Sequence, residues 1–307
     1  MKLVVLDGYT TNSGDLSWQA LEKLGDLTVY PRSTRAEAII RMKGVQGVFV
    51  NSVALDREMM DSAKSLEYIG VLCTGYNHID LAAAREKGIA VTNVSDYSTE
   101  AVAQHTIALL LELTNQVSIH NEAVQGGQWF KALDDCFYVK PLTLLAGKTL
   151  GIIGSGKIGS RVGDIAKALG MEVIIYSEDP KKAQIADVVS LHCPVTKDNW
   201  EMINKDFIGG MKDGAFLVNT ARGGLVNESD LAKALESGKL RGAGLDVLQV
   251  EPPEIENPSP LIGISNCIIT PHHAWMPIET RSKLISLAAD NLYGYLHKST
   301  KNRVDII

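Results

Sequence analysis

The stretch that decides the fold reads TLGIIGSGKIG and spans residues 149–159. Its apolar run ends in three glycines spaced Gly154-x-Gly156-x-x-Gly159, and the residues that follow place apolar side chains at helical spacing as far as Gly170. Glycines at this spacing allow a tight turn and the close approach of a pyrophosphate, while the helix N-terminus supplies amide donors. The stretch therefore predicts a strand, loop and helix that bind a dinucleotide.

The type of dinucleotide is less sharply marked. A carboxylate about 20 residues beyond such a loop accepts the ribose hydroxyls of NAD and repels the additional phosphate of NADP. Here Ser177 follows the second strand directly, Glu178 and Asp179 come next, and Lys181 and Lys182 are close behind. The acids favour NAD, whereas a serine near lysines would tolerate NADP. We predict NAD and leave NADP open.

The connection after this second strand is unusually short. Only the nine residues from Glu178 to Ala186 separate the strand ending near Ser177 from the next apolar run, Asp187–Leu191. Parallel strands need a crossover of about a dozen residues or more. Either the chain has lost a strand with its helices, or the sequence joins across a segment that the natural chain contains. We favour the second explanation.

The rest of the chain alternates strands and helices on both sides of this region. Because single cores stop growing at roughly 250–300 residues, a chain of 307 residues predicts two domains. Apolar runs predict strands at Leu3–Asp7, Val48–Asn51, Tyr68–Leu72, Ile89–Thr92, Leu150–Ile153, Glu172–Tyr176, Val188–Leu191, Ala215–Asn219, Ala243–Leu245 and Cys267–Thr270. Helical patterns lie at Leu16–Leu24, Arg35–Met42, Arg57–Ala63 and Ile278–His297. An α/β fold with parallel sheets flanked by helices follows.

The longest helical pattern lies between the two halves of the chain. It begins at Ser98 or Thr99, runs to about Val124, and carries apolar residues on more than one face. A helix of this kind is buried on several sides. We interpret it both as the link between two domains and as a subunit interface.

Composition and charge exclude several classes of protein. The formal charge of −6 is spread along the chain, without the basic block that nucleic-acid binding requires. The apolar runs are far shorter than the ~20 residues of a membrane span, and the first residues contain no signal-peptide pattern, so we predict a cytoplasmic protein. Four dispersed cysteines without C-x-x-C spacing predict neither disulfides nor a metal site.

Several polar residues follow strand-like runs in the last third of the chain. They are Arg222, Asp246, Glu251 and His272. The carboxyl ends of parallel strands open onto one crevice, so these side chains are expected to meet there. A guanidinium holds a carboxylate with two parallel hydrogen bonds, an imidazole exchanges protons near neutral pH, and a neighbouring carboxylate fixes the tautomer of that imidazole. This combination predicts proton and hydride transfer on a small acid.

Two assignments stay open at this level. Chemistry alone does not decide whether His272 or the adjacent His273 exchanges the proton. In the first half of the chain, the backbone amides around Gly75, between Thr74 and Tyr76, form either an anion nest for a substrate carboxylate or simply a turn.

Taken together, these residues resemble the D-2-hydroxyacid dehydrogenase family, and the order of motifs is similar over nearly the whole chain. The stretches that carry the resemblance are Thr74–Asp80, Gly154–Gly159, Leu191–Pro194, Asn219–Gly224, Gly244–Val247 with Glu251-Pro252, and Pro271–Ala274. Within the family the chain is most similar to the glycerate dehydrogenases, also called hydroxypyruvate or glyoxylate reductases.

The resemblance implies roles for individual residues. Arg222 would orient the substrate carboxylate and polarise the carbonyl, Glu251 would support the catalytic histidine, and the Pro-His-x-Ala pattern selects His272 over His273. The implied cofactor contacts are Thr106, Gly154, Gly156, Lys157, Ile158, Ser177, His192, Cys193, Pro194, Thr220, Ala221, Arg222, Asp246, His272 and Ala274. The implied substrate contacts are Thr74, Gly75, Tyr76, Arg222 and His272.

The resemblance also implies an architecture and a reaction. Two Rossmann-like domains are expected, with the active site in the cleft between them. Residues 1–98 with 276–307 would form a discontinuous, flavodoxin-like substrate domain, and residues 99–275 the NAD(P)-binding domain. The expected reaction is the reversible NAD(P)H-dependent reduction of hydroxypyruvate or glyoxylate to D-glycerate or glycolate, by a homodimer.

Three rival functions remain at this level. A formate-type dehydrogenase would not need the pair of Glu251 and His272. A corepressor-like protein that senses the cofactor would share the fold. A phosphoglycerate dehydrogenase would need a phosphate pocket, which no basic cluster in the sequence clearly marks.

Overall fold

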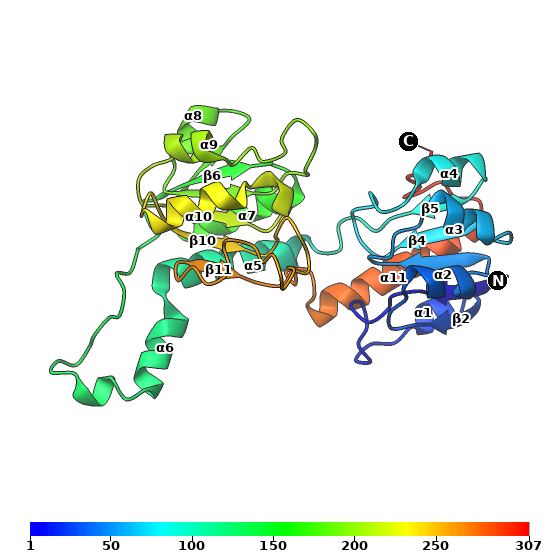
Figure 1. The fold of residues 1–307 in the computed structure, drawn as a ribbon, viewed down its shortest axis with the longest axis horizontal. Coiled ribbons are helices and arrows are strands. Elements are labelled where there is room, and N and C mark those ends of the chain that lie inside the picture. The colour runs from blue at the N-terminus through cyan, green and yellow to red at the C-terminus, as the bar shows by residue number, and fades with distance from the viewer. Residues whose placement is uncertain (307) are drawn as a thin grey trace. The chain divides into compact units, whose positions relative to one another are not determined.

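The computed structural model describes residues 1–306 and divides the chain into two compact units (Figure 1). Unit 1 comprises Met1–Ser98 together with the residues from Trp275 onward, and unit 2 comprises Thr99–Ala274. Each unit is a parallel sheet flanked by helices, which confirms the predicted fold class.

Unit 1 contains a five-stranded sheet in the order β2-β1-β3-β4-β5, the order of flavodoxin-like folds. Its strands are β1 (Lys2–Val5), β2 (Asp26–Val29), β3 (Gly47–Val50), β4 (Tyr68–Val71) and β5 (Ala90–Thr92). Its helices are α1 (Gln19–Glu22), α2 (Arg35–Arg41), α3 (Arg57–Ser62), α4 (Leu81–Glu86) and α11 (Ile278–Leu296). The sequence reading missed β2 and α4 and made α1 too long. In β2, for example, exposed and half-buried positions alternate and no side chain is fully buried.

Unit 2 contains a six-stranded sheet in the order β11-β10-β9-β8-β6-β7. Its strands are β6 (Thr149–Ile153), β7 (Glu172–Ile175), β8 (Val188–Leu191), β9 (Ala215–Asn219), β10 (Leu240–Leu245) and β11 (Cys267–Ile269). Its helices are α5 (Thr99–Asn115), α6 (Val117–Gln125), α7 (Lys157–Ala168), α8 (Pro180–Gln184), α9 (Lys205–Gly210) and α10 (Glu228–Glu236), with short 3-10 turns η1 (Trp129–Lys131) and η2 (Gly223–Leu225). The chain enters the sheet at β6 and fills it in both directions, so the strand order reverses between β6 and β8.

The short connection from β7 to β8 passes through a single short helix. The one-turn helix α8 carries the chain across β6, and the backbone passes so close that a Cβ on Gly151 would lie 2.1 Å from the carbonyl oxygen of Ala183. Asp179 starts α8 by accepting a hydrogen bond from the Lys182 amide. The nine residues from Glu178 to Ala186 form a crossover in this structure. That the natural chain contains a further segment here stays a prediction. In the common doubly wound order another strand lies beyond β7, whereas here β7 is the edge.

The expected single helix to Val124 is in fact two helices. Helix α5 ends at Asn115, Gln116 adopts the left-handed conformation with φ 53°, and α6 begins at Val117. Leu113, just before the break, packs into the core as the earlier apolar residues of α5 do. The apolar periodicity alone therefore did not reveal that the helix ends. Figure 1 shows α6 and the following residues reaching away from the six-stranded sheet before the chain returns to β6.

The two longest helices both serve the cores of their own units. Helix α5 packs Leu109 and Leu110 into the core of unit 2, and α11 packs Leu284 and Leu292 into the core of unit 1. No helix within residues 1–306 is both long enough and apolar enough to cross a membrane.

Candidate active site

The predicted site residues of unit 2 gather at the carboxyl edge of its sheet, where the strand order reverses. The glycine loop follows β6, and His192 and Cys193 follow the neighbouring strand β8. Gly154 has φ 101°, and a Cβ there would lie 2.6 Å from the backbone nitrogen of Cys193. Only glycine fits this turn, because the chain has a left-handed conformation in contact with the next strand end.

The loop fits the pyrophosphate of a dinucleotide. Gly156 is the N-cap of α7, and no side chain caps this helix, so the first amide donors of α7 have no partner from a capping side chain. A Cβ on Gly156 would meet no atom within 4 Å, which leaves open space above the loop. Uncapped amides at a helix N-terminus attract a phosphate. Lys157 and Ile158 would lie at this contact.

Arg222 is presented by a turn that its own strand builds. The side chain of Asn219, the last residue of β9, accepts a hydrogen bond from the Ala221 amide at 3.0 Å and donates one to the Arg222 carbonyl at 2.9 Å. The exposed guanidinium of Arg222 donates to the Ala221 carbonyl through Nη1 at 2.7 Å. Its other nitrogens remain available to a carboxylate.

Glu251 and His272 form a direct pair. Nδ1 of His272 lies 2.6 Å from Oε2 of Glu251, and the side chains keep 42% and 33% of their exposure. Oε1 of Glu251 accepts the Leu248 amide at 2.8 Å. Burial alone would raise the pKa of Glu251, but the hydrogen bond and charge of His272, the Leu248 amide and the charge of Arg222 hold that pKa below its usual value. The carboxylate therefore stays ionised at neutral pH.

The backbone separates the two adjacent histidines. His272 has φ 52°, and its amide bonds the Asp246 carbonyl at 2.8 Å. Its ring meets Glu251, whereas the ring of His273 packs edge-on against His105 with centroids 4.8 Å apart. Of the two adjacent imidazoles, His272 is therefore the one paired with the carboxylate.

Asp246 has a different task from Glu251. Only 1% exposed, its carboxylate accepts the amides of His273 and Ala274 and the hydroxyl of Thr270. Its carboxylate holds the turn around His272, whereas Glu251 bonds the His272 ring.

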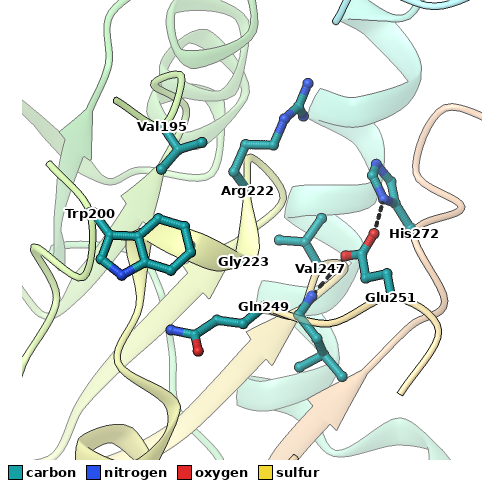
Figure 2. Close-up of a pocket in the computed structure, with 10 residues that line it drawn as sticks. Val195, Trp200, Arg222, Gly223, Val247, Gln249, Glu251 and His272 are labelled. Atoms are coloured by element: carbon teal, nitrogen blue, oxygen red, sulfur yellow. Dashed lines mark hydrogen bonds and ion pairs between the residues drawn. The ribbon is translucent and has the colours of Figure 1, made fainter. Parts of the chain in front are cut away.

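Arg222, Glu251 and His272 line one cavity of about 300 Å³. Its wall also includes Val195, Trp200 and Gln249. Figure 2 shows Val195 and Trp200 across the cavity from His272 and Glu251, with Arg222 between the two sides. A cavity of this size accepts a small organic acid.

Most of the remaining predicted cofactor residues lie along the same strand ends. Thr106 of α5 reaches Thr220, the residue after β9, through a hydrogen bond of 2.8 Å between their hydroxyls. The Nδ1 atom of His192 is buried without a hydrogen-bond partner among the described residues, although the residue as a whole is partly exposed. Burial lowers the pKa of His192 to about 4, so this ring is neutral and cannot offer a cation. Pro194 follows β8, Ala221 follows β9, and Ala274 is bonded to Asp246.

In the region expected to bind the ribose, two of the candidate side chains are already engaged by other residues. Asp179 is used to cap α8, and Lys182 pairs with Glu172 at 2.7 Å. Ser177 and the exposed Glu178 are left at the end of β7. The structure therefore leaves the choice between NAD and NADP to these two side chains and Lys181.

The predicted substrate loop of Thr74, Gly75 and Tyr76 belongs to unit 1. The Thr74 hydroxyl donates to the Val94 carbonyl at 3.1 Å, and the Cys73 thiol donates to the Gly75 carbonyl at 2.9 Å. These bonds fix the turn after β4 without using the Gly75 amide.

Sequence reasoning missed several residues around the site. His105 and Thr270 bond each other beside Asp246, while Trp200 and Gln249 line the cavity. The available signal for His105 was a polar side chain inside an otherwise apolar helix. Trp200 offered no signal, because only the folded chain brings it against Gly224, where a Cβ would meet its ring at 2.4 Å.

Comparison with known proteins adds a family to this geometry. Residues 107–274 match the family model described as D-isomer specific 2-hydroxyacid dehydrogenase, NAD binding domain. The chain is 43% identical to the hydroxypyruvate reductase of Blautia hydrogenotrophica, over 99% of this chain and 100% of that protein. That alignment spans 323 positions, more than the 307 residues here, so gaps fall within the present chain.

Two solved structures match the whole chain. The acyclic imino acid reductase Bsp5, in complex with NADPH and D-Arg, superposes with a TM-score of 0.85 at 28% identity and covers 99% of this chain and 100% of its own. D-lactate dehydrogenase from Aquifex aeolicus, complexed with NAD and lactic acid, gives a TM-score of 0.83 at 27% identity and covers 98% and 99%.

Proposed function

The chain belongs to the D-isomer specific 2-hydroxyacid dehydrogenase family, and from this premise we propose that it reduces hydroxypyruvate or glyoxylate to D-glycerate or glycolate. Membership confirms the predicted enzyme class, an oxidoreductase with a nicotinamide cofactor. The observation that carries the proposal is the 2.6 Å contact between His272 and Glu251 in a cavity that Arg222 also lines. The similarity to a hydroxypyruvate reductase supports the choice of substrate.

The proposed mechanism divides the work among three side chains. Arg222 holds the substrate carboxylate with its planar fork and places positive charge beside the carbonyl. His272 keeps Nδ1–H on Glu251 and exchanges the reaction proton with the carbonyl oxygen through Nε2. A dinucleotide held by its pyrophosphate at the glycine loop would supply the hydride from its nicotinamide. In the reverse direction Nε2 takes the proton from the hydroxyl group.

We further propose that two chains assemble through the segment from α6 to β6. Large apolar side chains are exposed along it, including Phe130 at 94%, Leu133 at 101% and Leu144 at 76%. Soluble monomers rarely expose such a group of side chains. A second copy is the proposed occupant, and Phe130→Glu with Leu133→Glu should convert a dimer to a monomer in light scattering. A wild-type monomer would refute this part.

The proposed location is the cytoplasm. The four cysteines form no disulfide within residues 1–306, as expected in a reducing compartment.

Initial rates with a panel of 2-oxo acids test the proposed function. We expect hydroxypyruvate and glyoxylate to give the highest kcat/KM, each with NADH and NADPH compared side by side. Arg222→Lys, which keeps the charge but loses the planar fork, should raise KM for every acid. Pyruvate and a phosphorylated 2-oxo acid serve as controls. A preference for the phosphorylated acid would assign a different substrate, and no reduction of any acid would refute the proposal.

A further inference from the structure

The turn that carries His272 is held in an unfavourable conformation. Residues other than glycine rarely adopt the left-handed region, and His272 has φ 52°. Such a conformation persists only where surrounding bonds hold it. What holds residues 270–274 therefore also decides where the His272 ring points.

Asp246 accepts most of the hydrogen bonds that fix this turn. Its carbonyl accepts the His272 amide at 2.8 Å. Its carboxylate accepts the His273 amide at 3.0 Å, the Ala274 amide at 2.9 Å and the Thr270 hydroxyl at 2.6 Å. The Thr270 hydroxyl is the movable member, because the Leu245 carbonyl lies 3.4 Å away as a second acceptor.

His105 fixes the direction of that hydroxyl. Nε2 of His105 lies 2.9 Å from Oγ1 of Thr270. The hydroxyl has a single proton, and the short bond to Asp246 uses it, so His105 must be the donor in this contact. A donor aimed at Oγ1 leaves the hydroxyl proton directed at Asp246. The three residues form a chain that runs from His105 Nε2–H through the Thr270 hydroxyl to the Asp246 carboxylate.

We propose that His105 is a positioning residue that acts through Thr270 and Asp246 to aim His272 at Glu251. The inference rests on the proposed catalytic role of His272. His105 itself lines neither the cavity nor the glycine loop, so it acts only through the turn.

A metal site is the competing interpretation of this cluster. The ligand atoms of His105, Asp246 and His273 lie within 4.8 Å of one another. A metal needs the lone pair of a histidine nitrogen, whereas the bond to Thr270 requires a proton on Nε2 of His105. The hydrogen-bond chain already occupies the atoms that a metal would use.

Four variants separate positioning from simple packing. His105→Leu removes the donor, His105→Gln keeps an N–H donor of similar reach, and Thr270→Val removes the hydroxyl with little change of shape. Thr114→Val is the matched control, because the Thr114 hydroxyl bonds only carbonyls of its own helix α5. The assays are kcat and KM for hydroxypyruvate, and NADH affinity by fluorescence.

We expect His105→Leu and Thr270→Val each to lower kcat roughly tenfold to a hundredfold, since small misplacements of a catalytic group have effects of this size. KM and NADH affinity should change little, and His105→Gln should recover most of kcat. The double variant His105→Leu/Thr270→Val should be no worse than either single variant, because both break one chain. Thr114→Val should match the wild type.

Several results would overturn the inference. They are an unchanged kcat in His105→Leu, failure of His105→Gln to recover activity, or losses that multiply in the double variant. If His105→Leu does not fold, the near-isosteric Thr270→Val decides the question alone. Loss of wild-type activity in a chelator, with recovery on adding zinc, would favour the metal interpretation. Failure of the proposed function is separable, because the wild type itself would then reduce none of the 2-oxo acids.

Discussion

Two pairs of histidine and carboxylate lie close to each other in unit 2, and they differ in burial and in bonding. His272 and Glu251 touch directly at 2.6 Å and keep a third or more of their side-chain exposure. His105 and Asp246 are 3.5 Å apart, with 19% and 1% exposure, and Thr270 bridges them.

The difference shows how one chemical combination serves two purposes. The exposed pair has an accessible imidazole that can exchange protons with a substrate. In the buried pair, burial lowers the pKa of His105, the charge of Asp246 opposes that shift and His273 reinforces it. His105 therefore stays neutral and serves as a fixed donor. The first pair should control activity, and the second should control stability and alignment.

Replacing His272 should have the largest effect. His272→Asn removes the proton donor, so kcat should fall by roughly 10²–10⁴-fold, the usual contribution of general acid–base catalysis. NADH affinity, measured by fluorescence titration, should stay close to the wild type because the glycine loop is unchanged. Loss of NADH binding would instead assign His272 a structural task.

Changing its partner should have a smaller effect on turnover. Glu251→Gln keeps the shape but removes the charge that supports the imidazole, and kcat should fall about tenfold to a hundredfold. The free energy of unfolding should change by less than about 0.5 kcal/mol, because the pair is half exposed. Steady-state rates and urea unfolding measure the two quantities. If Glu251→Gln keeps the kcat of the wild type, the pair of Glu251 and His272 does not control activity as described.

A third imidazole, His192, extends the comparison to a partly buried histidine whose ring has no carboxylate partner among the described residues. The pKa of His192 is lowered to about 4, from 6.5, so between these pH values the unfolded chain binds a proton that the folded chain does not. The contribution of His192 to the free energy of unfolding is complete above about pH 6.5. It declines as the pH falls and levels off below about pH 4, with a total loss on the order of 3 kcal/mol. Urea unfolding at pH 7 and pH 5 should show a weaker pH dependence in His192→Asn. If the free energy of unfolding falls equally between pH 7 and pH 5 in the wild type and in His192→Asn, this prediction is wrong.

The buried carboxylate should matter more for stability than the exposed one. Asp246→Asn replaces one acceptor oxygen with an amide that cannot accept the bonds Asp246 makes, and should lower the free energy of unfolding by about 2 kcal/mol. Glu251→Gln is the matched control in the same denaturation experiment. Equal losses for both variants would mean that burial does not separate the pairs.

Much of this arrangement could be predicted from the sequence, because strand ends carry local signals. Apolar runs followed by glycines or polar residues placed Arg222, Glu251 and His272 at one sheet edge, and the structure brings all three to one cavity. The family and the fold class followed from the same motifs.

The features that were missed depend on contacts between distant segments. Thr270 meets His105 across 165 positions of the chain, and no local pattern encodes that distance. The break at Gln116 was hidden by a continuous apolar pattern. The close passage of Ala183 over Gly151, which lets nine residues link β7 and β8, likewise depends on the folded chain.

The most direct test of the exposed pair is the position of the proton on the neutral His272 ring. Nitrogen-15 NMR of histidine-labelled enzyme, with the signal assigned through His272→Asn, should show the proton on Nδ1 and a bare Nε2 facing the cavity. Glu251→Ala should lose this preference. A wild-type ring protonated on Nε2, or one that keeps the same tautomer without Glu251, would contradict the account.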